Sequence, residues 1–135
     1  CHRQFAELLV ASTEEVKGEL PDAMVEKLKK KAHAAPTQIL ILFRPQVGNK
    51  IPIWEQRVTA SCTGYAMVLA AHGLGIGAVW KSAGCGPGSQ MKSVLEMKES
   101  DEMLGWVNLG TSLAAVNSGL RDWNLGLVSR WNGST

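Results

Sequence analysis

The spacing of hydrophobic and polar positions predicts four helices and three strands. Apolar residues recur every three to four positions in the helical segments, while short continuous apolar runs mark the strands. The predicted helices span residues 3–17, 21–33, 52–72 and 89–98, and the predicted strands span residues 37–44, 76–81 and 103–110. This order predicts an α+β fold with too few strands for a complete doubly wound sheet.

Two features of the first two helices carry expectations of their own. The Ser12-x-x-Glu15 spacing is typical of a capping box, which allows a break in the first helix near Ser12. The second helix contains the lysine-rich run at residues 27–31, which has two interpretations. One is a patch for phosphate or nucleic acid. The other, which we favour, is a solvated helix face on which Glu26 pairs with Lys30.

The strand at 37–44 and the long helix at 52–72 are apolar on all sides. The run from Ile39 to Phe43 predicts a central strand whose two faces are both covered. The long helix has no polar face after Arg57, which predicts burial inside the domain or against a partner chain. Small residues would allow another helix to approach closely; they are Ala60, Ser61, Gly64 and Ala71.

Length and composition describe one ordinary globular domain. The chain has 135 residues, of which 45% are hydrophobic and 19% are charged. A net charge of +2 gives no case for nucleic acid or an anionic membrane as the main partner. The segment Val58–Trp80 carries no charged residue, but its glycines and hydroxyl groups argue against a membrane span.

Cysteine usage indicates a reducing, cytoplasmic location. The three cysteines (Cys1, Cys62 and Cys85) form no CxxC pair and show no metal-ligand spacing with the three histidines. Cys62 lies among apolar neighbours, which predicts a small core residue. The chain begins without Met and without an apolar signal segment, so no export route is expected.

Two glycine clusters invite a nucleotide-binding interpretation. The glycines at 73, 75 and 77 follow a helix and precede a strand, the reverse of a dinucleotide-binding loop, and therefore predict a left-handed helix cap. The segment Gly84–Gly88 lies between a strand and a helix but lacks the Gly-Lys-Ser/Thr ending of a P-loop. We interpret it as a tight turn, with an anion at the helix start near Ser89 as the alternative.

The candidate binding residues are Trp80, Lys81 and Ser82, at the end of a predicted buried strand. The aromatic ring can stack on a planar polar ligand, the cation can balance its negative charge, and the hydroxyl group can form a hydrogen bond to it. From chemistry alone, a plain surface corner is the alternative interpretation.

Three segments taken together carry a resemblance to a known family. They are IPIWEQ at the start of the long helix, GLGIGAVWKS after it, and LGWVNLGT in the last strand. From about Phe5 to Thr111 the chain resembles the compact bacterial branch of the FMN-dependent nitroreductase family.

The resemblance implies a single nitroreductase-like domain over residues 1–135, with a mixed sheet flanked by helices, in an intertwined homodimer that holds FMN at its interface. Trp80, Lys81 and Ser82 then fall where the family's strand end contacts the flavin. NAD(P)H would reduce the flavin in a ping-pong reaction. A small-molecule electron acceptor, such as a nitro compound or a quinone, would reoxidise it. No side chain is required as a catalytic acid or base.

The sequence departs from the family pattern in ways that limit this expectation. Ala83 stands where the family often has Gly. Separately, residues 112–135 are expected to form an extended tail. The family's N-terminal Arg-Arg-Ser type motif, which holds the FMN phosphate, has no counterpart in residues 1–20, where Arg3 is the sole arginine. We therefore expect the chain to be the C-terminal part of the family fold and to bind FMN weakly or not at all. The second hypothesis is a non-catalytic dimeric binding module that has lost the flavin.

Overall fold

The structure, a computed structural model, describes residues 1–112 together with Gly126 and Ser129. Within them lie four helices and three strands: α1 (His2–Lys17), α2 (Asp22–Ala32), β1 (Thr37–Phe43), α3 (Ile53–Gly73), β2 (Gly77–Lys81), α4 (Ser89–Val94) and β3 (Glu102–Gly110). The α+β class and all seven predicted elements are confirmed, with α4 ending four residues earlier than expected. Apart from Ser112, Gly126 and Ser129, the predicted tail lies outside the described residues.

The three strands form one sheet in the order β1-β3-β2, and both pairings are antiparallel. The prediction that 37–44 is the central strand is wrong, because β3 takes the centre and β1 pairs only with β3 among the described strands. The apolar run in β1 indicates that both faces of the strand are covered, and helices cover both faces of this sheet. It carries no information about how many strands lie beside it.

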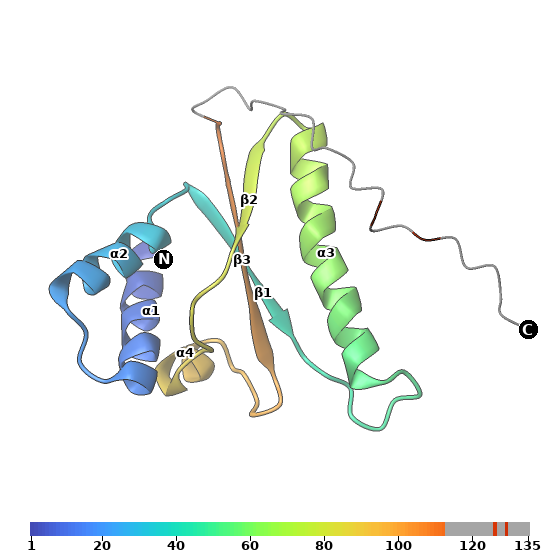
Figure 1. The fold of residues 1–135 in the computed structure, drawn as a ribbon, viewed down its shortest axis with the longest axis horizontal. Coiled ribbons are helices and arrows are strands. Elements are labelled where there is room, and N and C mark those ends of the chain that lie inside the picture. Colours follow the sequence, from blue (N-terminus) through green and yellow to red (C-terminus); the bar gives the residue numbers. More distant parts are fainter. Residues whose placement is uncertain (113–125, 127–128, 130–135) are drawn as a thin grey trace, which may run out of the picture.

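Helices cover both faces of the sheet. Figure 1 shows α3 along one side, with α1, α2 and α4 on the other. The main core lies on the α1 side, where the ring of Phe5 meets the ring of Trp106 edge-on at 5.2 Å between centroids. The buried residues of this core are Phe5, Ala6, Leu8, Leu9, Ala32, Met91 and Trp106. None of the described helices is both long and apolar enough to cross a membrane.

Helix α1 runs through Ser12 without the break that the capping-box spacing allowed. The Ser12 hydroxyl donates to the carbonyl of Leu8 at 2.7 Å and accepts the backbone N–H of Gly88 at 2.9 Å. The first bond lies within α1, whereas the second joins α1 to the residue before α4. Glu15 caps α4 and not its own helix. Its Oε2 accepts the backbone N–H of Ser89 at 2.7 Å and the Ser89 hydroxyl at 3.1 Å. The chain's own carboxylate therefore sits at the start of α4, where the sequence allowed for an external anion.

Helix α3 lies close to the sheet because Gly64 faces it. A Cβ at Gly64 would come within 2.6 Å of the Trp80 ring. The outward side of α3 is exposed in the single chain and includes Cys62, so the prediction of Cys62 as a core residue is wrong for the chain alone. Beyond the helix, Gly75 has φ 72°, which confirms the predicted left-handed cap.

A bidentate ion pair anchors the start of α3. Arg57 donates from Nε and one terminal nitrogen to the two carboxylate oxygens of Glu102, at 2.9 and 2.6 Å, and its guanidinium lies 5.7 Å from the centroid of the Phe43 ring. The hydrogen bond to Glu102, with the negative charge of that carboxylate, raises the pKa of Arg57 above its ordinary value. The contact joins α3 to β1 and β3 at one end of the sheet.

Candidate binding site

The structure places Trp80 and Lys81 on opposite faces of the sheet. Trp80 is half-buried on the α3 side, and its indole N–H donates to the carbonyl of Leu104 at 3.2 Å. Lys81 pairs in register with Trp106, so it points toward the α1 and α2 side, where it is exposed. Ser82 follows the end of β2 and is also exposed. The side chains of Trp80 and Lys81 therefore do not share one surface, and Lys81 shares a hollow with lysines of the α2 helix.

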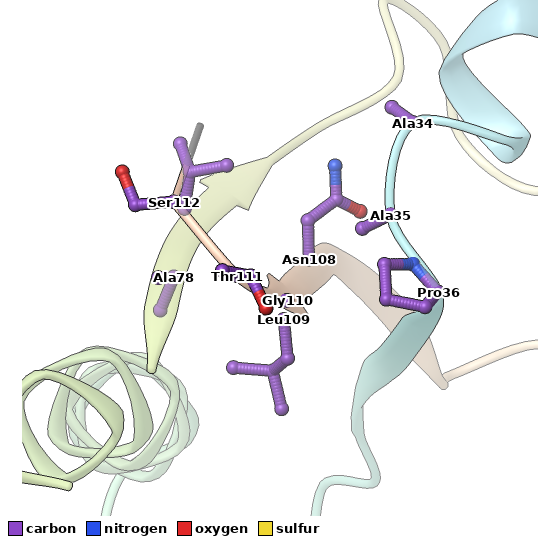
Figure 2. A pocket seen from close by; sticks show the side chains of 11 residues that line it. Ala34, Ala35, Pro36, Ala78, Asn108, Leu109, Gly110, Thr111 and Ser112 are labelled. Carbon is purple, nitrogen blue, oxygen red and sulfur yellow. The ribbon is translucent and has the colours of Figure 1, made fainter. Parts of the chain in front are cut away.

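A hollow of about 270 Å³ lies where β2, β3 and the segment before β1 come together. Its lining comes from the ranges 34–36, 77–79 and 108–112. Figure 2 shows the Asn108 side chain extending from β3 toward the segment 34–36, with its amide at the tip. The lining is mostly small or apolar, so Asn108 is the main polar side chain that the strands offer to this space.

Asn108 is 5% exposed and is held by one hydrogen bond. Gln38 Nε2 donates to Asn108 Oδ1 at 2.7 Å and to the Lys31 carbonyl at 3.1 Å. This arrangement uses the acceptor of the Asn108 amide. Its nitrogen, which is a donor, takes part in no hydrogen bond within the described residues.

An adjoining hollow of about 320 Å³ shares Ala34 and Asn108 with the first. We call it the lysine trough; its lining is Lys27, Lys30, Lys31, Ala34, Lys81 and Asn108. The trough therefore combines three lysines of α2 with one from the end of β2. No carboxylate lines it, and none of its four lysines forms an ion pair within the described part of the chain.

The structure corrects the predicted pairing on α2. Glu26 contacts Lys29 Nζ at 3.2 Å, three residues away, and does not pair with Lys30. Lys29 lines neither the trough nor a smaller hollow of about 110 Å³ that shares Lys27 and Lys31 with it. The lysine run therefore divides into one residue that is neutralised on the helix surface and three that face the trough.

Sequence reasoning identified Lys81 and the α2 lysines but did not bring them together. Fifty residues separate Lys31 from Lys81, and no local spacing indicates their contact across the sheet edge. Asn108 was not singled out at all, although its place in an otherwise apolar strand was the available signal. Among the described residues no group of three His, Cys, Asp or Glu side chains is placed to hold a metal ion.

The fold and the site define an α+β domain with a small antiparallel sheet between helices and a hollow bordered by lysine residues at one strand end. A sequence model described as the Nitroreductase family matches residues 2–111. The chain therefore belongs to the nitroreductase family, which confirms the resemblance drawn from the three sequence segments.

Relatives and a solved structure agree with this assignment. The chain is 29% identical over 90 residues to "Putative NAD(P)H nitroreductase YdjA" of Escherichia coli strain K12, covering 67% of this chain and 49% of that protein. It is 30% identical over 100 residues to "Putative NAD(P)H nitroreductase" of Haemophilus influenzae, covering 73% and 54%. The chain thus spans about half the length of these curated relatives.

The structural comparison supports the fold. The crystal structure of a nitroreductase-like family protein from Bacillus cereus superimposes with a TM-score of 0.72 at 16% identity, covering 98% of this chain and 68% of the other. At that identity the likeness establishes the architecture alone.

Proposed function

We propose that the protein is an FMN-dependent oxidoreductase that passes electrons from NAD(P)H to a nitro compound, a quinone or a similar small acceptor. Family membership and the names of the relatives support NAD(P)H as the electron donor. The observation that carries the proposal is the position of Lys81, an exposed ammonium group at the end of β2 with no carboxylate partner within the described residues. We place the reaction in the cytoplasm because all three cysteines are free.

The residues present fit a flavin nucleotide. Lys81 offers an ammonium group and Ser82 a hydroxyl donor at the end of β2, while the phosphate and the ring carbonyls of FMN are acceptors. When bound, FMN supplies the hydride and electron chemistry, and the protein supplies position and charge. The fit rests on this complementarity of donors and acceptors.

Each residue of the predicted segment has a distinct task in this proposal. Trp80, held by Leu104 and packed against α3 at Gly64, fixes the end of β2. Lys81 then presents a positive charge that favours the negatively charged, reduced form of the ring. Ser82, exposed just beyond the strand, presents a hydroxyl group that can donate to a ring acceptor. No side chain needs to act as an obligatory acid or base.

The test is a potentiometric titration of the flavin-loaded protein. Lys81→Met should lower the midpoint potential of the bound flavin, because removal of the cation destabilises the reduced anion. Lys29→Met is the matched control, because it removes the same positive charge at a residue that does not line the trough. The midpoint potential of the flavin in this variant should equal that in the wild type. An unchanged potential in Lys81→Met with FMN bound would remove Lys81 from the site. A purified full-length protein with no flavin absorption bands would favour the non-catalytic module instead.

We also propose that the protein works as a homodimer through α3. Large apolar side chains recur on the outward side of this helix at spacings of four, seven and four residues, forming one exposed stripe. Their exposed fractions are 64% for Trp54, 52% for Val58, 59% for Tyr65 and 55% for Leu69. Burial of a large apolar side chain contributes roughly 1.5–3 kcal/mol to the free energy of association. Packing of the stripe against the same stripe of a second chain is therefore favourable.

Light scattering tests the dimer. The wild type should have twice the chain mass, and Val58→Glu with Leu69→Glu should give a monomer, because each charge would be buried without a partner. Val16→Glu is the control, since Val16 is 66% exposed on α1, away from the stripe, and this variant should stay dimeric. A wild-type monomer that persists at high concentration contradicts the proposal.

A further inference from the structure

We infer that Trp80 is a positioning residue for Lys81. Its indole N–H holds the end of β2 on β3, so that the Lys81 ammonium group keeps a fixed place at the strand end. This inference rests on the proposed function, in which that ammonium group stands beside the flavin. It gives Trp80 a different task from the stacking on a ligand that its aromatic ring suggests in the sequence, because the ring already packs against two elements of the chain.

A β-bulge in β3 supplies the acceptor for this indole. The register of β1 on β3 shifts after Ile41 and passes over Leu104, and the register of β2 stops before it reaches that residue. The extra residue of a bulge is left unpaired in the ladder. The carbonyl of Leu104 accepts the indole N–H of Trp80 at 3.2 Å, so a side chain provides the contact that the strands do not.

This hydrogen bond reaches past the last backbone pair of β2. Lys81 pairs with Trp106 at the end of the strand, and Leu104 lies further along β3. The end of an element opens more easily than its middle, because it has neighbours on one side only. A bond from Trp80, the residue before Lys81, therefore ties down the pair that fixes the Lys81 backbone.

Two glycines form the slot that holds the indole ring. A Cβ at Gly64 of α3 would lie 2.6 Å from Cζ3 and Cη2 of Trp80, and a Cβ at Gly105 of β3 would lie 2.7 Å from its Nε1. The six-membered ring thus meets α3, which lies beside β2 (Figure 1), while the ring nitrogen meets β3. Close packing at both ends restricts the indole to the orientation in which its N–H reaches Leu104.

The orientation of the two side chains makes the effect of Trp80 indirect. Trp80 and Lys81 point to opposite faces of the sheet, so the indole does not share the surface that carries the ammonium group. What Trp80 changes is the position of the Lys81 backbone, and with it the distance from the cation to a bound ligand. The attraction between a cation and a reduced, negatively charged flavin falls as this distance grows.

The experiment separates an effect through Lys81 from a direct effect on the flavin. The midpoint potential of the flavin-loaded, full-length protein is measured for Trp80→Phe, for Lys81→Met and for the double variant. Phenylalanine keeps an aromatic ring in the slot and removes the N–H donor. Leu9→Ala is the control for a general loss of stability, because Leu9 is buried in the α1 core and is not part of the slot.

A second measurement does not depend on flavin. Hydrogen exchange followed by mass spectrometry reports how often residues 77–82 open, relative to residues 37–43 of β1 in the same molecule. Loss of the indole hydrogen bond should speed exchange at 77–82 by about two- to tenfold, the range that the net contribution of one hydrogen bond gives.

We expect Trp80→Phe to lower the midpoint potential by less than Lys81→Met does, and to add nothing when Lys81→Met is already present. Leu9→Ala should keep the wild-type potential. An unchanged potential in Trp80→Phe with FMN bound would overturn the inference. An equal shift in the Lys81→Met background would also overturn it, because Trp80 would then act on the flavin itself.

Failure of the proposed function gives a different result. A protein that binds no flavin contradicts that function, and the exchange measurement then decides the role of Trp80: faster exchange at 77–82 in Trp80→Phe supports it, and unchanged exchange overturns it. Should Trp80→Phe fail to fold, nuclear magnetic resonance of the wild type decides. The indole proton of Trp80 should exchange with solvent more slowly than that of Trp54, which is 64% exposed, and equal rates overturn the inference.

Discussion

Gly105 occupies a position in β3 where any side chain should disturb the end of β2. Its φ is 128°, in a region that residues with a Cβ rarely adopt, and it lies where the pairing of β1 with β3 shifts register. A Cβ at this position would overlap the backbone carbonyl oxygen of Lys81 and lie 2.7 Å from the Trp80 indole nitrogen. Backbone atoms cannot rotate away as the end of a flexible side chain can, so Gly105→Ala must move the strand itself.

Two costs add in this variant. An alanine held at this φ costs about 1–3 kcal/mol, and inserting a methyl group into a closely packed position typically costs about 1–3 kcal/mol. Together they lower the free energy of unfolding by about 2–6 kcal/mol, a large part of the roughly 5–15 kcal/mol available to a domain. The same movement displaces Trp80 and Lys81, so any flavin affinity should fall along with stability.

Urea unfolding monitored by tryptophan fluorescence provides the measurement. With a slope of about 2 kcal/mol per M, the midpoint of Gly105→Ala should fall by about 1–3 M at equal protein concentration. Gly73→Ala is the matched control, because Gly73 lies in α3 with open space around its Cβ position and no positive φ. Its midpoint should match or exceed that of the wild type, since alanine favours a helix by about 1 kcal/mol over glycine. A Gly105→Ala midpoint equal to that of the wild type would refute this reasoning.

Three further results are expected. Glu15→Ala removes the carboxylate that accepts from Ser89 at the start of α4 and should lower the free energy of unfolding in urea by about 0.5–2 kcal/mol. Glu14→Ala is the control and should leave it almost unchanged, because the Glu14 side chain makes no hydrogen bond or ion pair within the described residues. Leu9→Ala, at a residue 1% exposed, should lower the free energy of unfolding by about 2–5 kcal/mol, and a smaller loss would show that the core refills the cavity. Cys62, exposed on the outward side of α3, should react with a thiol reagent slowly in a concentrated sample and faster after dilution; a rate independent of protein concentration would contradict a dimer covering that side.

The hydrophobic pattern was sufficient to find the secondary structure. The apolar positions of α1, including Leu8 and Leu9, recur at helical spacing and are buried in the structure, so a local rule reports a tertiary fact. The pattern was insufficient for the position of β1 in the sheet. Apolar residues on a strand indicate that its faces are covered. The neighbours of a strand in the sheet are set by backbone hydrogen bonds, which every residue type except proline can form and which the side-chain pattern therefore does not predict.

The all-round apolar character of α3 predicted burial inside the domain or against a partner chain, and the sequence left open which side meets the sheet. In the structure one side packs on the sheet through Gly64, and the other presents Trp54, Val58, Tyr65 and Leu69 to solvent in the single chain. Residue spacing defines the stripe. Which of the two sides meets the sheet depends on the small residue that permits close approach.

The sequence by itself determined the family, the order of the elements and the segment Trp80–Ser82, because each of these is written in contiguous residues. Only the tertiary structure decided that Trp80 and Lys81 face opposite sides of the sheet, and that Lys81 shares a hollow with the lysines of α2. Strand alternation separates neighbours in the chain, and the approach of α2 to the end of β2 joins residues fifty positions apart. The identity of each side chain is therefore local information in this protein, whereas which side chains share a hollow is a property of the folded chain.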